Sequence, residues 1–219
     1  MSNRMERVEV FWGKVIAGYT HEIKNILATI NESGGFVEDI YRLGKQDDPV
    51  YQRKIASSLE IIQDQVERGE RLTSQLNTLA HSPDQELNRI SLQEDLSVMI
   101  DLSQRFARRN NVILRQEETR EQVVLTTNRL LFMHLVFVAL DWSLAGYQAG
   151  GEILIRPQPG PAVCHVQIFC LGEDISREPG GNEWKLLQKL CRDLQGRLQW
   201  DDSDQVLTLT LPQALSTSE

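Results

Sequence analysis

The sequence lacks the features that would place it in several large protein classes. It has no run of about 18 apolar residues, so we expect no membrane-spanning helix. The most apolar stretch, residues 130–142, contains His134 and Asp141 and is typical of a buried core helix. The N-terminal segment has no apolar region of the kind found in signal peptides. No His, Cys and carboxylate residues show metal-ligand spacing, and we therefore expect no metal site.

Cysteine and positive charge are also scarce. The three cysteines, Cys164, Cys170 and Cys191, are an odd number without metal-like spacing, which favours a reducing cytoplasm. There are 23 Lys and Arg against 31 Asp and Glu, a net charge of 23 − 31 = −8. Such a chain is a poor general ligand for nucleic acid or anionic membranes. Only residues 105–111 form a basic stretch, so we expect neither partner.

Two long segments in the first third have helical periodicity. Apolar residues recur every three or four positions over residues 6–43 and again over 51–80, and the polar segment 44–50 separates them. This pattern predicts an antiparallel helical hairpin, which we assign to a domain of residues 1–82. Two helices alone bury such stripes poorly. The pattern therefore favours a homodimer with a four-helix bundle; the alternative is that the hairpin packs on the rest of the same chain.

The rest of the chain has a different sequence pattern, with shorter helical and strand-like segments in alternation. Residues 83–90 are polar and contain Pro83, and we interpret them as a linker to a domain of residues 91–219. A capping box begins at Ser91, and Thr127 is the predicted N-cap of the next helix. Helices are expected over 91–109, 128–147 and 183–195, and strands over 112–116, 122–126, 152–157, 162–170, 197–200 and 205–212. This order predicts an α/β sandwich with its helices on one face of a mixed sheet, and an α+β fold for the whole chain.

The segment His21-Glu22-Ile23-Lys24-Asn25 carries the most specific chemical signal. At 3.6 residues per turn, His21 lies roughly 160° from the centre of the apolar stripe, and Asn25 lies one turn further on the same face. Imidazole is a good nucleophile near neutral pH because its unperturbed pKa is about 6.5. An acidic neighbour that binds one ring nitrogen leaves the other free to attack, and Glu22 is the local candidate for that role. A solvated surface histidine is the alternative interpretation.

Residues 18–30, GYTHEIKNILATI, resemble the phosphoacceptor box of bacterial sensor histidine kinases. That box also lies on the first helix of a dimerising hairpin. The resemblance implies that His21 is the phosphorylated residue and that Glu22 and Asn25 assist phosphotransfer or phosphatase reactions. Ile26 stands where these kinases often have a helix-kinking proline.

The second domain resembles the ATP-binding domain shared by histidine kinases, gyrases and Hsp90, but with a degenerate nucleotide site. Asp141 stands where that family has a magnesium-coordinating asparagine, and the bulky Trp142 follows where a small residue is usual. The Asp-X-Gly-X-Gly motif is missing. The glycine-rich phosphate loop is reduced to Gly180-Gly181, for which a simple turn is the favoured interpretation. The resemblance therefore implies that no nucleotide cofactor is bound.

An intact phosphoacceptor hairpin with an emptied ATPase domain resembles the ChpT-type histidine phosphotransferases. This resemblance implies a phosphorelay protein that exchanges phosphoryl groups between His21 and aspartates of response-regulator receiver domains, with an upstream hybrid histidine kinase as the source. The receiver would supply Mg²⁺, so the chain itself needs no cofactor. The alternatives are a response-regulator phosphatase, a non-catalytic pseudokinase regulator and an ATP-dependent histidine kinase.

Overall fold

The computed structural model describes residues 2–81, 86–119, 121–148, 150–173, 175 and 177–215. The chain divides into two compact units, Met1–Thr78 and Leu79–Glu219. The predicted boundary between residues 82 and 83 lies outside the described residues. No helix in the described part of the chain combines the length and the hydropathy that crossing a bilayer requires.

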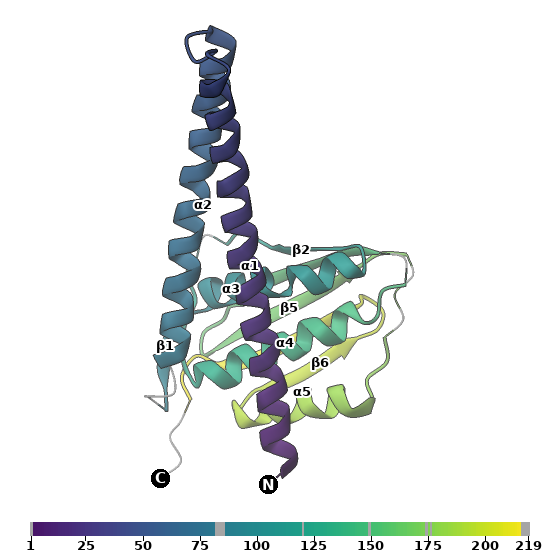
Figure 1. Ribbon diagram of the computed structural model, residues 1–219. Helices are drawn as coiled ribbons and strands as arrows, with labels where there is room; N and C mark the ends of the chain where they lie inside the picture. The colour runs from purple at the N-terminus through teal and green to yellow at the C-terminus, as the bar shows by residue number, and fades with distance from the viewer. Residues whose placement is uncertain are drawn as a thin grey trace. The chain divides into compact units, whose positions relative to one another are not determined.

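The first unit is a hairpin of two helices, α1 (Ser2–Arg42) and α2 (Pro49–His81) (Figure 1). Gly44, with φ +66°, takes the left-handed conformation that commonly ends a helix. Pro49 is the first residue of α2, a position where its missing N–H has no helical partner to lose. Asp48 Oδ1 accepts a hydrogen bond of 2.8 Å from the N–H of Val50. Both predicted helices are confirmed, and α1 begins before residue 6.

The hairpin leaves much of its apolar surface uncovered. Among the described residues, ten of the thirteen exposed large hydrophobic side chains belong to this unit: Ile16, Leu27, Phe36, Tyr41, Leu43, Val50, Leu59, Ile61, Val66 and Leu76. Several of them are members of the predicted apolar stripes. A single hairpin therefore does not bury its own stripes, as expected for two helices. The homodimer stays a prediction.

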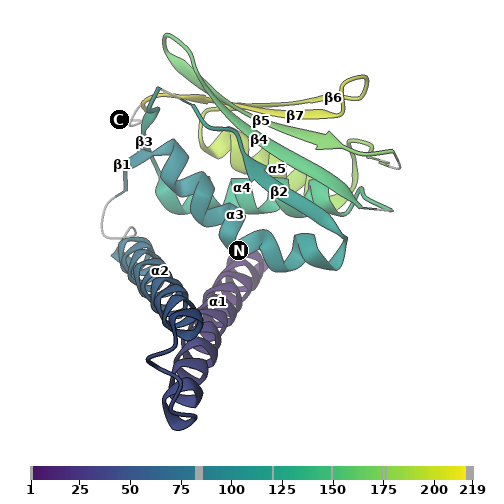
Figure 2. The same ribbon diagram turned by 90° about the horizontal axis from the view of Figure 1, so that it is seen from above.

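The second unit is an α/β domain. Its elements are β1 (Asn88–Ser91), α3 (Leu92–Arg109), β2 (Val112–Gln116), β3 (Val124–Thr127), α4 (Arg129–Leu144), β4 (Gly151–Pro159), β5 (Val163–Leu171), α5 (Gly181–Asp193), β6 (Arg197–Asp201) and β7 (Val206–Pro212). The five-stranded sheet has the order β2-β4-β5-β7-β6, and β1 pairs with β3 separately. Only β2 and β4 are parallel, so the sheet is mixed. Helices α3, α4 and α5 lie on one face of it (Figure 2). The predicted α+β fold is confirmed.

Two local expectations need correction. The strand β1 begins inside the segment 83–90 that the sequence indicated as a linker, because Asn88 to Ser91 pair with β3. The N-cap of α4 is Asn128 and not Thr127. Asn128 Oδ1 accepts from the N–H of Leu131 at 3.0 Å, whereas Thr127 is the buried last residue of β3. The Ser91 cap is confirmed, since its hydroxyl accepts from the N–H of Glu94.

The core of the second unit lies between the sheet and its helices. Alternate residues of β4, β5 and β7 are buried, and α4 is buried on nearly every side. Cys164, Cys170 and Cys191 are buried free thiols in this core. Burial raises the pKa of both Cys170 and Cys191 to about 11, so these thiols are inert near neutral pH.

A buried ion pair joins α3 to the start of α4. Arg129 donates from Nε to Asp95 Oδ2 at 3.0 Å and from Nη2 to Asp95 Oδ1 at 2.5 Å. The Asp95 side chain is only 2% exposed. Burial raises its pKa, while the Arg129 guanidinium acts in the opposite direction. Each charge therefore depends on the other for compensation in the core.

Replacing Asp95 by Asn or Arg129 by Met leaves one charge buried without its partner. We expect either change to lower the free energy of unfolding by about 3–5 kcal/mol, measured by urea denaturation at neutral pH. The control is Glu117→Gln, which removes a half-exposed partner of Arg156 and costs about 1 kcal/mol or less. Equal losses in the core and control variants would contradict this account.

The buried His134 makes stability depend on pH. Burial, followed by the positive charge of Lys189, lowers its pKa from 6.5 to about 4. Between these values the unfolded chain binds more protons than the folded one. Stability should therefore fall with decreasing pH, by at most about 1.4 kcal/mol per pH unit. In urea titrations from pH 7 to pH 4, His134→Gln should lose less stability than the wild type; parallel curves would show that His134 is not responsible.

Candidate functional site

His21 lies on α1 with Asn25 one turn further on the same face. Both side chains are partly exposed, and Asn25 Nδ2 lies 3.1 Å from His21 Nδ1. A half-turn of the amide exchanges its nitrogen and oxygen, so Asn25 can bind either tautomer of the ring. When its oxygen accepts the Nδ1–H, Nε2 keeps its lone pair. The structure thus brings together two of the three predicted site residues.

The hydrogen-bond partner of Glu22 lies on α2. Oε1 of Glu22 accepts a hydrogen bond from Nη2 of Arg68, and this ion pair joins α1 to α2. Adjacent helix positions differ by about 100° around the axis, so Glu22 and His21 do not naturally face each other. The ring partner in the structure is therefore Asn25, whereas the sequence made Glu22 the local candidate. Arg68 is a partner of a candidate site residue that the sequence did not indicate.

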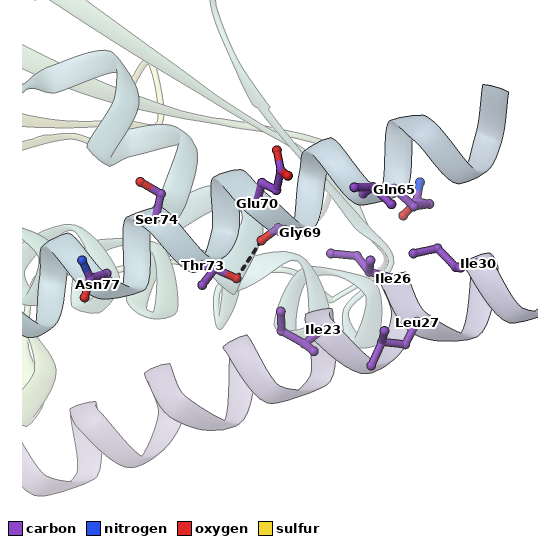
Figure 3. Close-up of a pocket in the computed structure, with 11 residues that line it drawn as sticks. Ile23, Ile26, Leu27, Ile30, Gln65, Gly69, Glu70, Thr73, Ser74 and Asn77 are labelled. Carbon is purple, nitrogen blue, oxygen red and sulfur yellow. Dashed lines mark hydrogen bonds between the residues drawn. The ribbon is translucent and has the colours of Figure 1, made fainter. Parts of the chain in front are cut away.

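A groove between α1 and α2 begins two residues after His21. Its volume is about 640 Å³, and Ile23, Ile26, Leu27 and Ile30 line it from α1 (Figure 3). On the α2 side, a Cβ atom added to Gly69 would lie 3.8 Å from Cγ2 of Ile26, an ordinary contact. The two helices thus approach each other at Gly69 and leave an open groove that is apolar on the α1 side and lined mostly by polar residues on the α2 side, among them Gln65, Glu70 and Asn77.

In the second unit, Trp142 fills the core where the sequence indicated a degenerate nucleotide site. The indole is 1% exposed and lies between Trp184 and Trp200, with ring centroids at 5.1 Å and 5.0 Å. The guanidinium of Arg177 covers the same ring, with Cζ 5.0 Å from its centroid. These aromatic and cation–π contacts make Trp142 part of the core.

The remaining residues of the predicted nucleotide site are Asp141, Gly180 and Gly181. Burial lowers the pKa of Arg177, and the carboxylates of Glu183 and Asp141 oppose that shift, so Asp141 acts on a cation of its own chain. Gly180 and Gly181 lead into α5, and Gly181 has φ +72°. The sequence favoured a simple turn here, whereas the structure places Gly180 at the N-cap and Gly181 in the first position of α5. Across the described ranges, no three His, Cys, Asp or Glu side chains are placed to hold a metal ion.

No protein-family model matches the sequence, and no curated protein matches it. The fold is similar to solved histidine kinase structures. The nucleotide-free catalytic domain of histidine kinase ThkA has a TM-score of 0.52 and 14% identity over 60% of this chain and 100% of that domain. Histidine kinase AdeS of Acinetobacter baumannii has a TM-score of 0.50 and 14% identity over 86% of this chain and 97% of that one. The chain therefore has a histidine-kinase-like fold.

The packing of Trp142 gives a direct test of the second unit. We expect Trp142→Ala to lower the free energy of unfolding by about 3–5 kcal/mol, because the cavity it leaves is enclosed by two other indoles. Urea denaturation followed by far-UV circular dichroism measures the loss. The partly exposed Trp184 is the control, and its replacement by Ala should cost less. A loss below about 1 kcal/mol for Trp142 would contradict its place in the core.

Proposed function

We propose that this chain is a histidine phosphotransferase, which carries a phosphoryl group on His21 and exchanges it with aspartates of response-regulator receiver domains. The observation that carries the proposal is the contact between Asn25 and His21 Nδ1 on a partly exposed helix face. A ring whose Nδ1–H is held by an amide presents Nε2 as a nucleophile. The histidine-kinase-like fold supports the same assignment.

In the proposed transfer, Nε2 of His21 attacks the phosphorus of a receiver's aspartyl phosphate. The P–O bond breaks, its electron pair leaves with the aspartate carboxylate, and the Nδ1 proton stays on the ring. Asn25 holds that proton while the ring becomes cationic, so no separate base is needed. Mg²⁺ bound by the receiver domain would neutralise charge on the moving phosphoryl group.

The packing of the second unit supports a phosphoryl donor other than ATP. Trp142 and Arg177 pack against each other in the region indicated as the degenerate nucleotide site, and Asp141 interacts electrostatically with Arg177. A nucleotide there would have to displace an enclosed indole. An upstream hybrid histidine kinase with its own receiver domain is therefore the proposed donor, and the second unit would serve as a docking surface.

A homodimer is part of the proposal. The α1 side of the groove of about 640 Å³ between α1 and α2 and the exposed Leu27, Leu59 and Val66 are apolar surface on long helices. A second hairpin is the proposed cover, because two more helices would complete a four-helix bundle and bury both stripes. The two His21 residues would then lie on one bundle.

The test is transfer of radioactive phosphate from a phosphorylated receiver domain to the purified full-length protein. We expect label on the wild type, none on His21→Ala and none when ATP alone is the donor. Replacement of His165, which hydrogen-bonds Thr210 in the sheet, is the matched control and should leave labelling intact.

Other outcomes identify the alternatives. Faster loss of receiver phosphate without label would indicate a response-regulator phosphatase. Binding to the receiver with neither label nor loss would indicate a non-catalytic regulator. Label from ATP alone would indicate a kinase. Each of these results contradicts the phosphotransferase.

A further inference from the structure

The ion pair between Glu22 and Arg68 brings a guanidinium of α2 to the residue that directly follows the candidate phosphorylated histidine. Arg68 comes from α2, and its side chain is 41% exposed, whereas that of Glu22 is 14% exposed. Glu22 directly follows His21, and neighbouring Cα atoms lie about 3.8 Å apart. Nη2 of Arg68 binds Oε1 of Glu22. A guanidinium has five N–H donors, so this bond leaves others for a second acceptor.

We propose that Arg68 binds the phosphoryl group on His21, and that Glu22 holds Arg68 in place for it. This inference rests on the proposed phosphotransferase function and adds a residue to its site. A phosphoryl group brings strong acceptor oxygens and a charge approaching −2, for which the planar fork of arginine is the best-matched side chain. In this proposal Glu22 anchors Arg68 through the hydrogen bond from Nη2 to Oε1.

The charge distribution during transfer explains what Arg68 does. As the P–O bond to the aspartate breaks and the N–P bond to Nε2 forms, negative charge spreads over the three equatorial oxygens. A guanidinium beside them stabilises that charge in both directions of the exchange. In the phosphorylated state it also favours the dianion, so it lowers the pKa of the phosphoryl group.

Other cations near His21 differ from Arg68. Lys24 is an exposed residue of α1. Arg71 lies three residues after Arg68 on α2, is 65% exposed and has Glu67 of its own helix as an ion-pair partner at 4.0 Å. Arg71→Gln therefore removes the same charge from the same helix without breaking a contact between α1 and α2, and it serves as the matched control.

The experiment begins with chemical phosphorylation of the full-length protein by phosphoramidate, which requires no partner protein. Phosphorus NMR then gives the pKa of the phosphoryl group on His21, and transfer to an unphosphorylated receiver gives the rate. We expect Arg68→Gln to raise the phosphoryl pKa and slow transfer about ten- to a hundredfold, the effect of losing one charged hydrogen bond. Arg68→Lys should recover part of both, and Arg71→Gln should match the wild type.

Glu22→Gln separates phosphoryl binding from a structural role. It removes the anchor of Arg68 but keeps the guanidinium, so the phosphoryl pKa should rise less than it does in Arg68→Gln. Equal pKa increases in Glu22→Gln and Arg68→Gln would mean that only the ion pair matters, and would overturn the inference. A wild-type pKa and rate in Arg68→Gln would overturn it too, with the phosphotransferase intact. Failure of wild-type His21 to accept phosphate from either phosphoramidate or a receiver would instead refute the proposed function.

Discussion

The helical period of α1 determines which side chains meet at His21. A separation of four residues returns to the same face, which places Asn25 against the ring, with Nδ2 3.1 Å from Nδ1. A separation of one residue turns by about 100°, which directs Glu22 to Arg68 on α2. One geometric rule therefore separates the two contacts: the amide on the same face meets the imidazole, and the neighbouring carboxylate pairs with a cation of α2. It also aligns the apolar residues of α1 along the groove that begins at Ile23.

The second unit has an architecture similar to that of a solved histidine kinase catalytic domain, with Trp142 buried in its core. Trp142 is enclosed by two other indoles and covered by Arg177, and Asp141 contributes to the electrostatic environment of that guanidinium. These contacts stabilise the unit from within. Under the proposed function, residues at the degenerate nucleotide site contribute to stability and not to ligand binding, and the unit would serve as a surface for a protein partner.

Much of the fold was predictable from the sequence because its signals are local. Apolar spacing indicated both helices of the hairpin, and the capping box located the start of α3 at Ser91. The N-cap of α4 was placed one residue early, since Thr127 and Asn128 are both good capping residues and only the pairing of β3 distinguishes them. His21 and Asn25 were found from their spacing of four. Arg68 was missed because it follows Glu22 by 46 residues, and sequence spacing does not give the register of one long helix against another.

The clustering of indoles has an optical consequence. Three of the four tryptophans in the chain belong to one group, with ring centroids about 5 Å apart around Trp142. Chromophores so close couple their electronic transitions, and the coupling disappears as soon as the rings separate. The α/β unit therefore contains most of the indoles that contribute to the near-ultraviolet signal of the protein. A loss of tertiary packing in this unit should change the near-ultraviolet circular dichroism while the hairpin is still helical. The tryptophans thus report on the α/β unit separately from the hairpin.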